Sequence, residues 1–230
     1  SKLYLNDGTG NLDISTFVNF AINPGINYSG DPADSGNYGS TWIDFDNDGD
    51  LDIYVAHCRQ STTSPTDLRR INRLFVNDGS NNYTEMADTF GIAIGWQTWT
   101  ASFGDLNNDG DLDLVLFNHD HTSQIFENDG TGHYTELMST GFNTDAITPI
   151  ESVVEDFDND GYADILVTGS DWMYWKNNGD MTFTQVNGLF ASNGMLSFAS
   201  GDLNHDGFID IYTSYGNIYT TPSSVADVLY

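Results

Sequence analysis

The chain has 230 residues, of which 34 are acidic and 6 are basic, and its formal net charge at pH 7 is −28. Binding to nucleic acid or to an anionic membrane surface needs clustered Lys and Arg, so this charge argues against both partners. The sequence has no apolar run of about eighteen residues, so it predicts no membrane-spanning helix. Its single cysteine, Cys58, excludes an internal disulfide.

The first element that the sequence predicts is a hairpin at residues 3–8, where a short strand ends in Asn6-Asp7-Gly8. Such endings are strong signals for a tight turn between antiparallel strands. The same string returns, with small changes, at residues 74–79, 125–130 and 174–179. The return strands are expected to begin at Tyr83, Tyr134 and Phe183.

A nine-residue acidic loop stands between successive hairpins and is written four times. The copies, called acidic loops 1 to 4 below, occupy residues 44–52, 105–113, 156–164 and 202–210. Oxygen-bearing side chains stand at positions 1, 3, 5 and 9 of each copy, and position 6 is always glycine. A sharp turn at the glycine would let these oxygens converge on one point. The variable position 7 fits a ligand that acts through its backbone carbonyl.

Converging oxygen ligands favour calcium over magnesium, because calcium accepts about six to eight of them in a flexible shell. Zinc is disfavoured, since the loops contain no cysteine and one histidine, His205, which is expected to point outward. One calcium ion per loop gives about four ions in all. The predicted ligands are Asp44, Asp46, Asp48, Asp50 and Asp52; Asp105, Asn107, Asp109, Asp111 and Asp113; Asp156, Asp158, Asp160, Tyr162 and Asp164; and Asp202, Asn204, Asp206, Phe208 and Asp210.

EF-hand loops begin in the same way, and plain solvated turns have a similar composition. An EF-hand needs a glutamate at position 12 and a helix on each side. Position 12 is instead Val55, Leu116, Val167 or Thr213, and the residues before it are apolar, β-branched or aromatic, which predicts strands. The loops could also be solvated turns, which Asp, Asn and Gly favour. Four copies in register favour metal sites.

Each period therefore predicts four antiparallel strands, two around the acidic loop and two around the hairpin turn. The acidic loops start 61, 51 and 46 residues apart, a spacing typical of propeller blades, and no stretch has helical periodicity. The sequence thus predicts an all-β protein, a β-propeller of four-stranded antiparallel blades. The longest insertion, residues 58–72, is expected between the second and third strands of its blade.

Residues 102–110 and 199–207 read Ser-Phe-Gly-Asp-Leu-Asn-Asn-Asp-Gly and Ala-Ser-Gly-Asp-Leu-Asn-His-Asp-Gly. They resemble the FG-GAP/VCBS repeat, the calcium-binding propeller repeat of integrin α heads, cartilage acidic proteins and bacterial surface proteins. The resemblance implies the propeller fold and calcium ligands at loop positions 1, 3, 5, 7 and 9, and it implies no reaction. Residues 152–155 lack the Phe-Gly of the repeat, which leaves the packing of that strand open.

The repeats divide the single domain, residues 1–230, into five segments. They are two strands of one blade at 1–35, full blades at 36–92, 93–145 and 146–190, and the opening strands of a last blade at 191–230. Leu229-Tyr230 has the same sequence as Leu3-Tyr4, so the chain is expected to start and stop at the same point of the repeat. This gives four repeats, beginning in mid-blade. Either the two ends complete a four-bladed ring or the chain is part of a larger propeller. We expect the larger one, with about seven blades as is common in the family.

Candidate ligand-binding residues outside the loops come from two groups. Trp96 and Trp172 are expected in loops, where aromatic faces bind sugars or proteins. Arg69, Arg70 and Arg73 are expected to form one basic patch that could dock an acidic glycan or protein. The tryptophans expected to fill the space between blades are Trp42, Trp99 and Trp175.

No catalytic constellation is identifiable. His119 and His121 lack a third partner and are expected in an exposed loop, and Cys58, beside His57, is expected to be buried. Extracellular modules bind calcium at about 10⁻⁴ to 10⁻³ M, which suits a secreted or cell-surface protein. We therefore expect a non-enzymatic adhesion module that binds an extracellular protein or a carbohydrate. An ancillary propeller of a secreted polysaccharide-degrading enzyme and a structural spacer in a large surface protein stay open as alternatives.

Overall fold

The computed structural model describes residues 5–6, 8–9, 12–13, 19–21, 37–80, 82–145, 147–190, 195–215 and 228–229. Within these residues the regular structure is all β-strand, which confirms the predicted all-β class. The same residues contain no helix with the length and apolar character that a membrane crossing requires. The chain forms two compact units, residues 1–98 and 99–230.

The first unit contains one small hairpin and one larger sheet. Its strands are β1 (Leu5–Asn6), β2 (Leu12–Asp13), β3 (Asn19–Ala21), β4 (Asn37–Ile43), β5 (Asp52–His57), β6 (Arg73–Asn77) and β7 (Asn82–Glu85). β1 pairs with β2 as the predicted first hairpin, and β4 to β7 form an antiparallel sheet in chain order. The predicted insertion, residues 58–72, connects β5 to β6.

Strand β3 departs from the prediction of purely antiparallel pairing. It lies parallel to β7 and extends the sheet to five strands, in the order β3-β7-β6-β5-β4. β7 is otherwise an edge strand with unpaired backbone N–H and C=O groups, and such an edge accepts a further strand in either direction. The periodicity of residues 19–21 carries no signal for this pairing.

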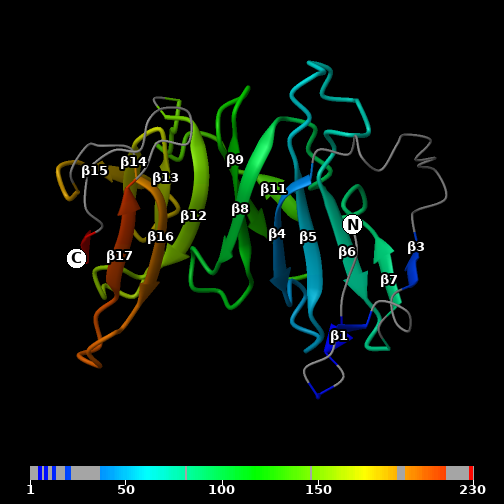
Figure 1. Cartoon of the computed structure of the whole chain (residues 1–230), viewed down its shortest axis with the longest axis horizontal. Helices are drawn as coiled ribbons and strands as arrows, with labels where there is room; N and C mark the ends of the chain where they lie inside the picture. The colour runs from blue at the N-terminus through cyan, green and yellow to red at the C-terminus, as the bar shows by residue number, and fades with distance from the viewer. Residues whose placement is uncertain are drawn as a thin grey trace. The chain divides into compact units, whose positions relative to one another are not determined.

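The second unit contains three sheets that follow one another along the chain (Figure 1). The first is β8 (Thr98–Gly104), β9 (Asp113–Asn118), β10 (Gln124–Asn128) and β11 (Tyr134–Glu136). The second is β12 (Pro149–Glu155), β13 (Asp164–Gly169), β14 (Trp172–Asn177) and β15 (Phe183–Val186). The third is β16 (Met195–Gly201), β17 (Asp210–Tyr215) and β18 (Val228–Leu229). All pairings in these sheets are antiparallel, as predicted.

The core of the second unit lies between consecutive sheets. Side chains of the β8–β11 sheet, such as Val115 and Phe117, form one buried cluster with Val167 and Trp175 of the β12–β15 sheet. A second cluster joins the β12–β15 sheet to Ile211 of β17. The central strands β9 and β13 are buried along their whole length, and both faces of the sheet that contains β13 are covered, one by each cluster. Face-to-face packing thus explains the apolar run at residues 165–167 in the middle of β13.

A glycine allows one of these contacts between sheets. A Cβ added at Gly104, the last residue of β8, would lie 2.4 Å from Cγ1 of Val154 on β12. Gly104 is the glycine of the Phe-Gly pair in the second repeat, and Val154 belongs to the segment that lacks this pair. The strand whose packing the sequence left open therefore packs its valine onto the glycine of the preceding sheet.

We expect Gly104→Ala to destabilise the second unit, because the new methyl group overlaps Val154. Overpacking of this kind costs about 1–3 kcal/mol. Val154→Ala removes the overlapping methyl groups. The double variant should therefore lose about 1 kcal/mol less stability than the sum of the losses of the two single variants. Urea denaturation of the wild type, both single variants and the double variant measures this coupling. Strictly additive losses would contradict the contact.

Candidate metal centre

The four acidic loops share one backbone conformation. Each connects the first and second strands of its sheet, β4 to β5, β8 to β9, β12 to β13 and β16 to β17. The position 6 glycines have φ between 89° and 94°, which confirms the sharp turn predicted there. Position 4 is also left-handed, with φ between 58° and 61°, and carries Asn in three loops and the exposed His205 in the fourth. Asparagine tolerates this conformation, so the second turn also has a signal in the sequence.

Backbone amides of each loop donate to the loop's own side chains. The position 6 N–H donates to Oδ2 of position 1 at 2.9–3.1 Å in all four loops. The position 7 N–H donates to Oδ1 of position 5 at 2.9–3.0 Å. Short Asp side chains favour such local turns. These bonds fix the side chains of positions 1 and 5 against the turn.

Position 9 has a second role that its place in the loop pattern does not indicate. Its side chain is buried in loops 1 to 3, where Asp52, Asp113 and Asp164 are at most 1% exposed. The carboxylate of Asp113 accepts the N–H of Leu106 in its own loop at 3.0 Å and the N–H of Asn128 at the hairpin turn at 2.9 Å. The equivalent bonds are present in loops 1 and 3. Position 9 therefore ties loops 1 to 3 to the third strand of their sheets.

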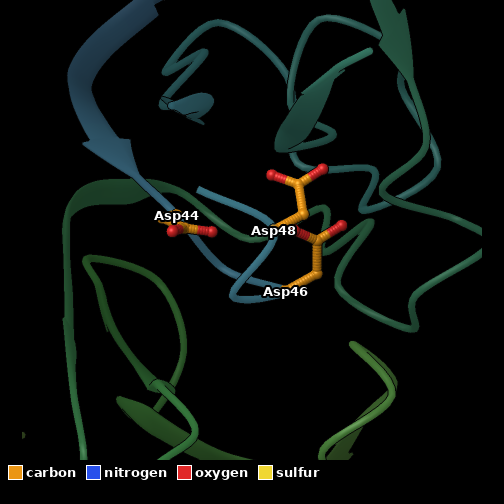
Figure 2. Close-up of side chains that lie close together, drawn as sticks. All are labelled: Asp44, Asp46 and Asp48. Carbon is orange, nitrogen blue, oxygen red and sulfur yellow. The ribbon is translucent and has the colours of Figure 1, made fainter. Parts of the chain in front are cut away.

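The structure brings predicted ligand atoms together in two of the loops. In acidic loop 1, oxygens of Asp44, Asp46 and Asp48 lie within 4.8 Å of one another, on the turn that Figure 2 shows. In acidic loop 3, positions 1, 3 and 9 meet in the same way. Loops 2 and 4 carry Asn at position 3, and its Nδ2 donates to the position 5 carboxylate at 2.8 and 2.9 Å. The carboxylate clusters of loops 1 and 3 could hold metal ions.

The donors at positions 1, 3, 5 and 9 fit a hard cation. All of them are carboxylate or amide oxygens, the ligands that calcium and magnesium take. Among the described residues, Oδ1 of Asp44 is buried and has no hydrogen-bond partner. A buried carboxylate oxygen is costly unless a donor or a cation meets it.

Burial changes the acidity of the position 9 aspartates. It raises the pKa of Asp52 and of Asp113 to about 7, and it also raises the pKa of Asp164. Other carboxylates of the loops, such as Asp109 beside Asp113, add to the rise, and the backbone donors partly oppose it. A bound cation would act in the opposite direction, because opposite charge favours the ionised form.

The predicted basic patch is wrong. Arg70 is fully buried, and its Nη1 donates to a backbone carbonyl of the insertion at 2.8 Å. Arg73 is 5% exposed and forms an ion pair with the buried Glu85 at 3.5 Å. Arg69 pairs with Asp67 through two hydrogen bonds of 2.9 and 2.6 Å. These guanidinium groups have partners within their own unit, so they form no exposed patch.

The predicted sorting of the tryptophans into buried and exposed residues is only partly correct. Trp175 is buried in the core, as expected. Trp42, on β4, is 49% exposed, so it does not fill the space between blades. Trp172 is the first residue of β14 and packs edge-on against Phe190, with ring centroids 4.6 Å apart, so it is half-buried and not an exposed loop residue. Trp96 lies in a bend and is half-buried.

The two neighbouring histidines have separate partners. His119 stacks on Trp99 with centroids 3.9 Å apart, and its Nε2 hydrogen-bonds to the carbonyl of Pro149 at 3.2 Å. His121 is exposed, and its Nδ1 lies 3.0 Å from the carbonyl of Thr122. The expected exposure therefore holds for His121 and is wrong for His119, whose ring is part of the packing.

Cys58 is buried, as predicted, and its Sγ lies 3.7 Å from Oε1 of Gln97. Its neighbour His57 is 3% exposed, and the backbone N–H of His57 donates to Oδ1 of Asn72 at 2.8 Å. Burial lowers the pKa of His57 to about 4, and the charge of Arg73 adds to this effect. The buried neutral imidazole of His57 and the buried thiol of Cys58 therefore contribute to the packing of their unit.

Lowering the pH should destabilise the protein through His57. Its folded pKa of about 4 lies below the ordinary value of 6.5, so between these values the unfolded chain binds a proton that the folded chain does not. This contribution to stability is present above pH 6.5 and lost as the pH falls, by about 2 kcal/mol at pH 5. Urea denaturation in chelator at pH 7 and pH 5 should show that the wild type loses about 2 kcal/mol more than His57→Gln. Equal losses would rule out a neutral buried imidazole.

A family model described as an FG-GAP-like repeat matches residues 44–116, 105–167 and 156–213. Each match runs from one acidic loop, through its sheet, to the strand that follows the next acidic loop. The matches together cover more than half of the chain. The chain belongs to the FG-GAP-like repeat family. The acidic loops are thus the boundaries at which successive FG-GAP-like repeats overlap.

No curated protein matches this FG-GAP-like repeat chain. Thirty-one chains of solved structures match it. One belongs to a structure titled as the structural basis of specific recognition of non-reducing terminal N-acetylglucosamine by a lectin of Agrocybe aegerita. The identity is 22%, the TM-score is 0.52, and the match covers 77% of this chain. The chain spans 46% of that lectin chain. At this identity the likeness supports the fold.

Proposed function

We propose that this FG-GAP-like repeat chain is a calcium-stabilised β-propeller that acts outside the cell as a glycan-binding module. The observation that carries the metal part is the repetition of one loop geometry at the same place in four sheets. The face-to-face packing of consecutive sheets in the second unit supports blades of a propeller. We propose that these blades belong to a larger ring of about seven.

Calcium is the cation that the loops suit best. Each loop offers oxygen donors from a short, Asp-rich turn, and calcium accepts such irregular shells more readily than magnesium does. Sites of this kind in extracellular modules are half-filled at about 10⁻⁴ to 10⁻³ M, which supports a role outside the cell. Binding would also offset the cost of ionising the buried position 9 aspartates, so calcium would contribute folding stability.

Exposed aromatic side chains on β4 favour a glycan as the ligand. Tyr38 is 51% and Trp42 is 49% exposed, and Ser40 between them is also exposed. Aromatic rings beside polar groups suit the apolar faces and hydroxyl groups of sugars. The similar Agrocybe aegerita chain is a lectin for terminal N-acetylglucosamine, which makes that sugar the first ligand to test. A protein ligand is the alternative for the same surface.

We propose no enzymatic activity for the chain. The side chains that could have suggested chemistry, His119 and the pair His57 and Cys58, are engaged in packing and hydrogen bonds. An ancillary role beside a polysaccharide-degrading domain would still use the β4 surface to hold the substrate. A spacer would bind calcium and no glycan, so a glycan-binding experiment separates these roles.

Calcium should raise the melting temperature of the full chain far more than magnesium does. At a calcium concentration 100 times the dissociation constant, each site should add about 2.7 kcal/mol, which corresponds to about 5–10 °C. Thermal melts in calcium, in magnesium and in chelator at constant ionic strength measure the difference. Coincident melts in all three solutions would mean that the acidic loops are only turns.

Trp42→Ala should weaken glycan binding by about tenfold, because a stacking surface is lost. The measurement is binding to immobilised glycans with terminal N-acetylglucosamine, in calcium. Met138→Ala is the matched control, since Met138 is 78% exposed and lies away from β4 in the sequence. Unchanged binding by the Trp42 variant would remove β4 from the ligand site. A wild-type chain that binds no glycan would favour a protein ligand or the spacer.

A further inference from the structure

One strand position near the acidic loops differs in charge from sheet to sheet. It is the residue just before the buried asparagine of the hairpin turn, called the pre-asparagine position here, and it is Val76 on β6, Glu127 on β10 and Lys176 on β14. The three positions are equivalent, because in each sheet the following asparagine donates its N–H to the position 9 aspartate, at 2.7, 2.9 and 2.8 Å. The side chain there is apolar in one sheet, acidic in the next and basic in the third.

Lys176 reaches into acidic loop 3. Its Nζ donates to Oδ2 of Asp160 at 2.7 Å and makes an even shorter contact with Oδ2 of Asp158. These carboxylates are positions 5 and 3 of the loop. The side chains of all three residues are about one-third exposed, at 35–36%. An ammonium group therefore occupies the side of loop 3 where two of the predicted ligands meet.

Glu127 makes the corresponding contact in acidic loop 2. Its Oε1 accepts a hydrogen bond from Nδ2 of Asn107, position 3 of that loop, at 3.3 Å. Loop 2 lacks the position 3 carboxylate of loops 1 and 3, and Glu127 supplies one from the neighbouring strand. At positions 1, 3, 5 and 9, whose side chains are the predicted ligands, loop 1 carries four carboxylates and loop 2 reaches four with Glu127, whereas Lys176 offsets one of the four in loop 3.

We propose that Lys176 is a built-in competitor of calcium at acidic loop 3, so that this loop is the weakest calcium site of loops 1 to 3. The inference rests on the proposed calcium sites and adds their order of filling. Oxygens of Asp158 and Asp160 cannot all serve an ammonium group and a divalent cation at once, and the two positive charges repel each other. Calcium at loop 3 therefore requires the ammonium group to leave these oxygens.

The chemistry of lysine suits such a competitor. A lysine head group is a compact point charge on a long stem with many rotamers, and it binds carboxylates without the fixed bidentate geometry of arginine. Partly exposed ion pairs are weak enough to be exchanged for water or for another cation. In the absence of calcium the same contact holds the carboxylates of loop 3 together. Loop 3 thus keeps its shape with its own cation and takes calcium only at a higher concentration.

The test is a series of variants at one position. Calcium titrations by calorimetry on the full chain are compared for the wild type, Lys176→Met and Lys176→Glu. We expect calcium affinity at loop 3 to rise about tenfold in Lys176→Met, and further in Lys176→Glu, which adds a carboxylate at the pre-asparagine position. Val76→Lys is the reciprocal variant and should weaken loop 1. Terbium(III), which takes the same oxygen ligands, reports on loop 3 through energy transfer from Tyr162, with Tyr162→Phe as the control.

Stability supplies a second readout with opposite signs. In chelator, Lys176→Met should be less stable than the wild type, because four carboxylates lose their counter-charge. In saturating calcium, the order should reverse. A lysine that only supports the fold would lower stability in both solutions and would leave the calcium affinities unchanged, and that result would overturn the proposal. A wild type that binds no calcium at any loop would instead overturn the proposed function, and the role of Lys176 with it.

Discussion

The structure depends on a carboxylate buried at the last position of acidic loops 1 to 3. Asp52, Asp113 and Asp164 lie at the start of a central strand, almost without exposure, and accept N–H groups from their own loop and from the neighbouring hairpin. A buried charge is costly, and hydrogen bonds offset only part of that cost. The residue that ties the loop to the sheet is therefore also one whose ionised form a bound cation would stabilise.

Successive loops of the second unit are also linked to each other. Nδ2 of Asn108 donates to the carbonyl of Gly161 at 2.6 Å, and Nδ2 of Asn159 donates to the carbonyl of Gly207 at 2.8 Å. The donor is the left-handed position 4 of one loop and the acceptor is the position 6 glycine of the next. A change in one loop therefore reaches the next through a single hydrogen bond. If the loops bind calcium as proposed, sites linked in this way would not fill independently.

Much of this arrangement could be predicted from the sequence. The Asn-Asp-Gly turns, the strands after each loop and the glycine turn are local features with strong residue preferences, and each is present. Features that depend on distant partners could not be read in the same way. Burial of Arg70 and the pairing of β3 with β7 depend on which segments meet in space. Lys176 and Glu127 lie 16 and 20 residues after the loop residues that they contact, Asp160 and Asn107, and only the hairpin register brings them to the loops.

The central claim is that each acidic loop holds one calcium ion. The most direct test is to count the ions on the folded full chain by native mass spectrometry after equilibration with calcium. We predict about four ions on the wild type, one per loop. We predict one fewer on Asp105→Ala/Asp109→Ala, which removes two carboxylates from loop 2. A wild type without calcium, or a double variant with the same number of ions, would contradict the claim.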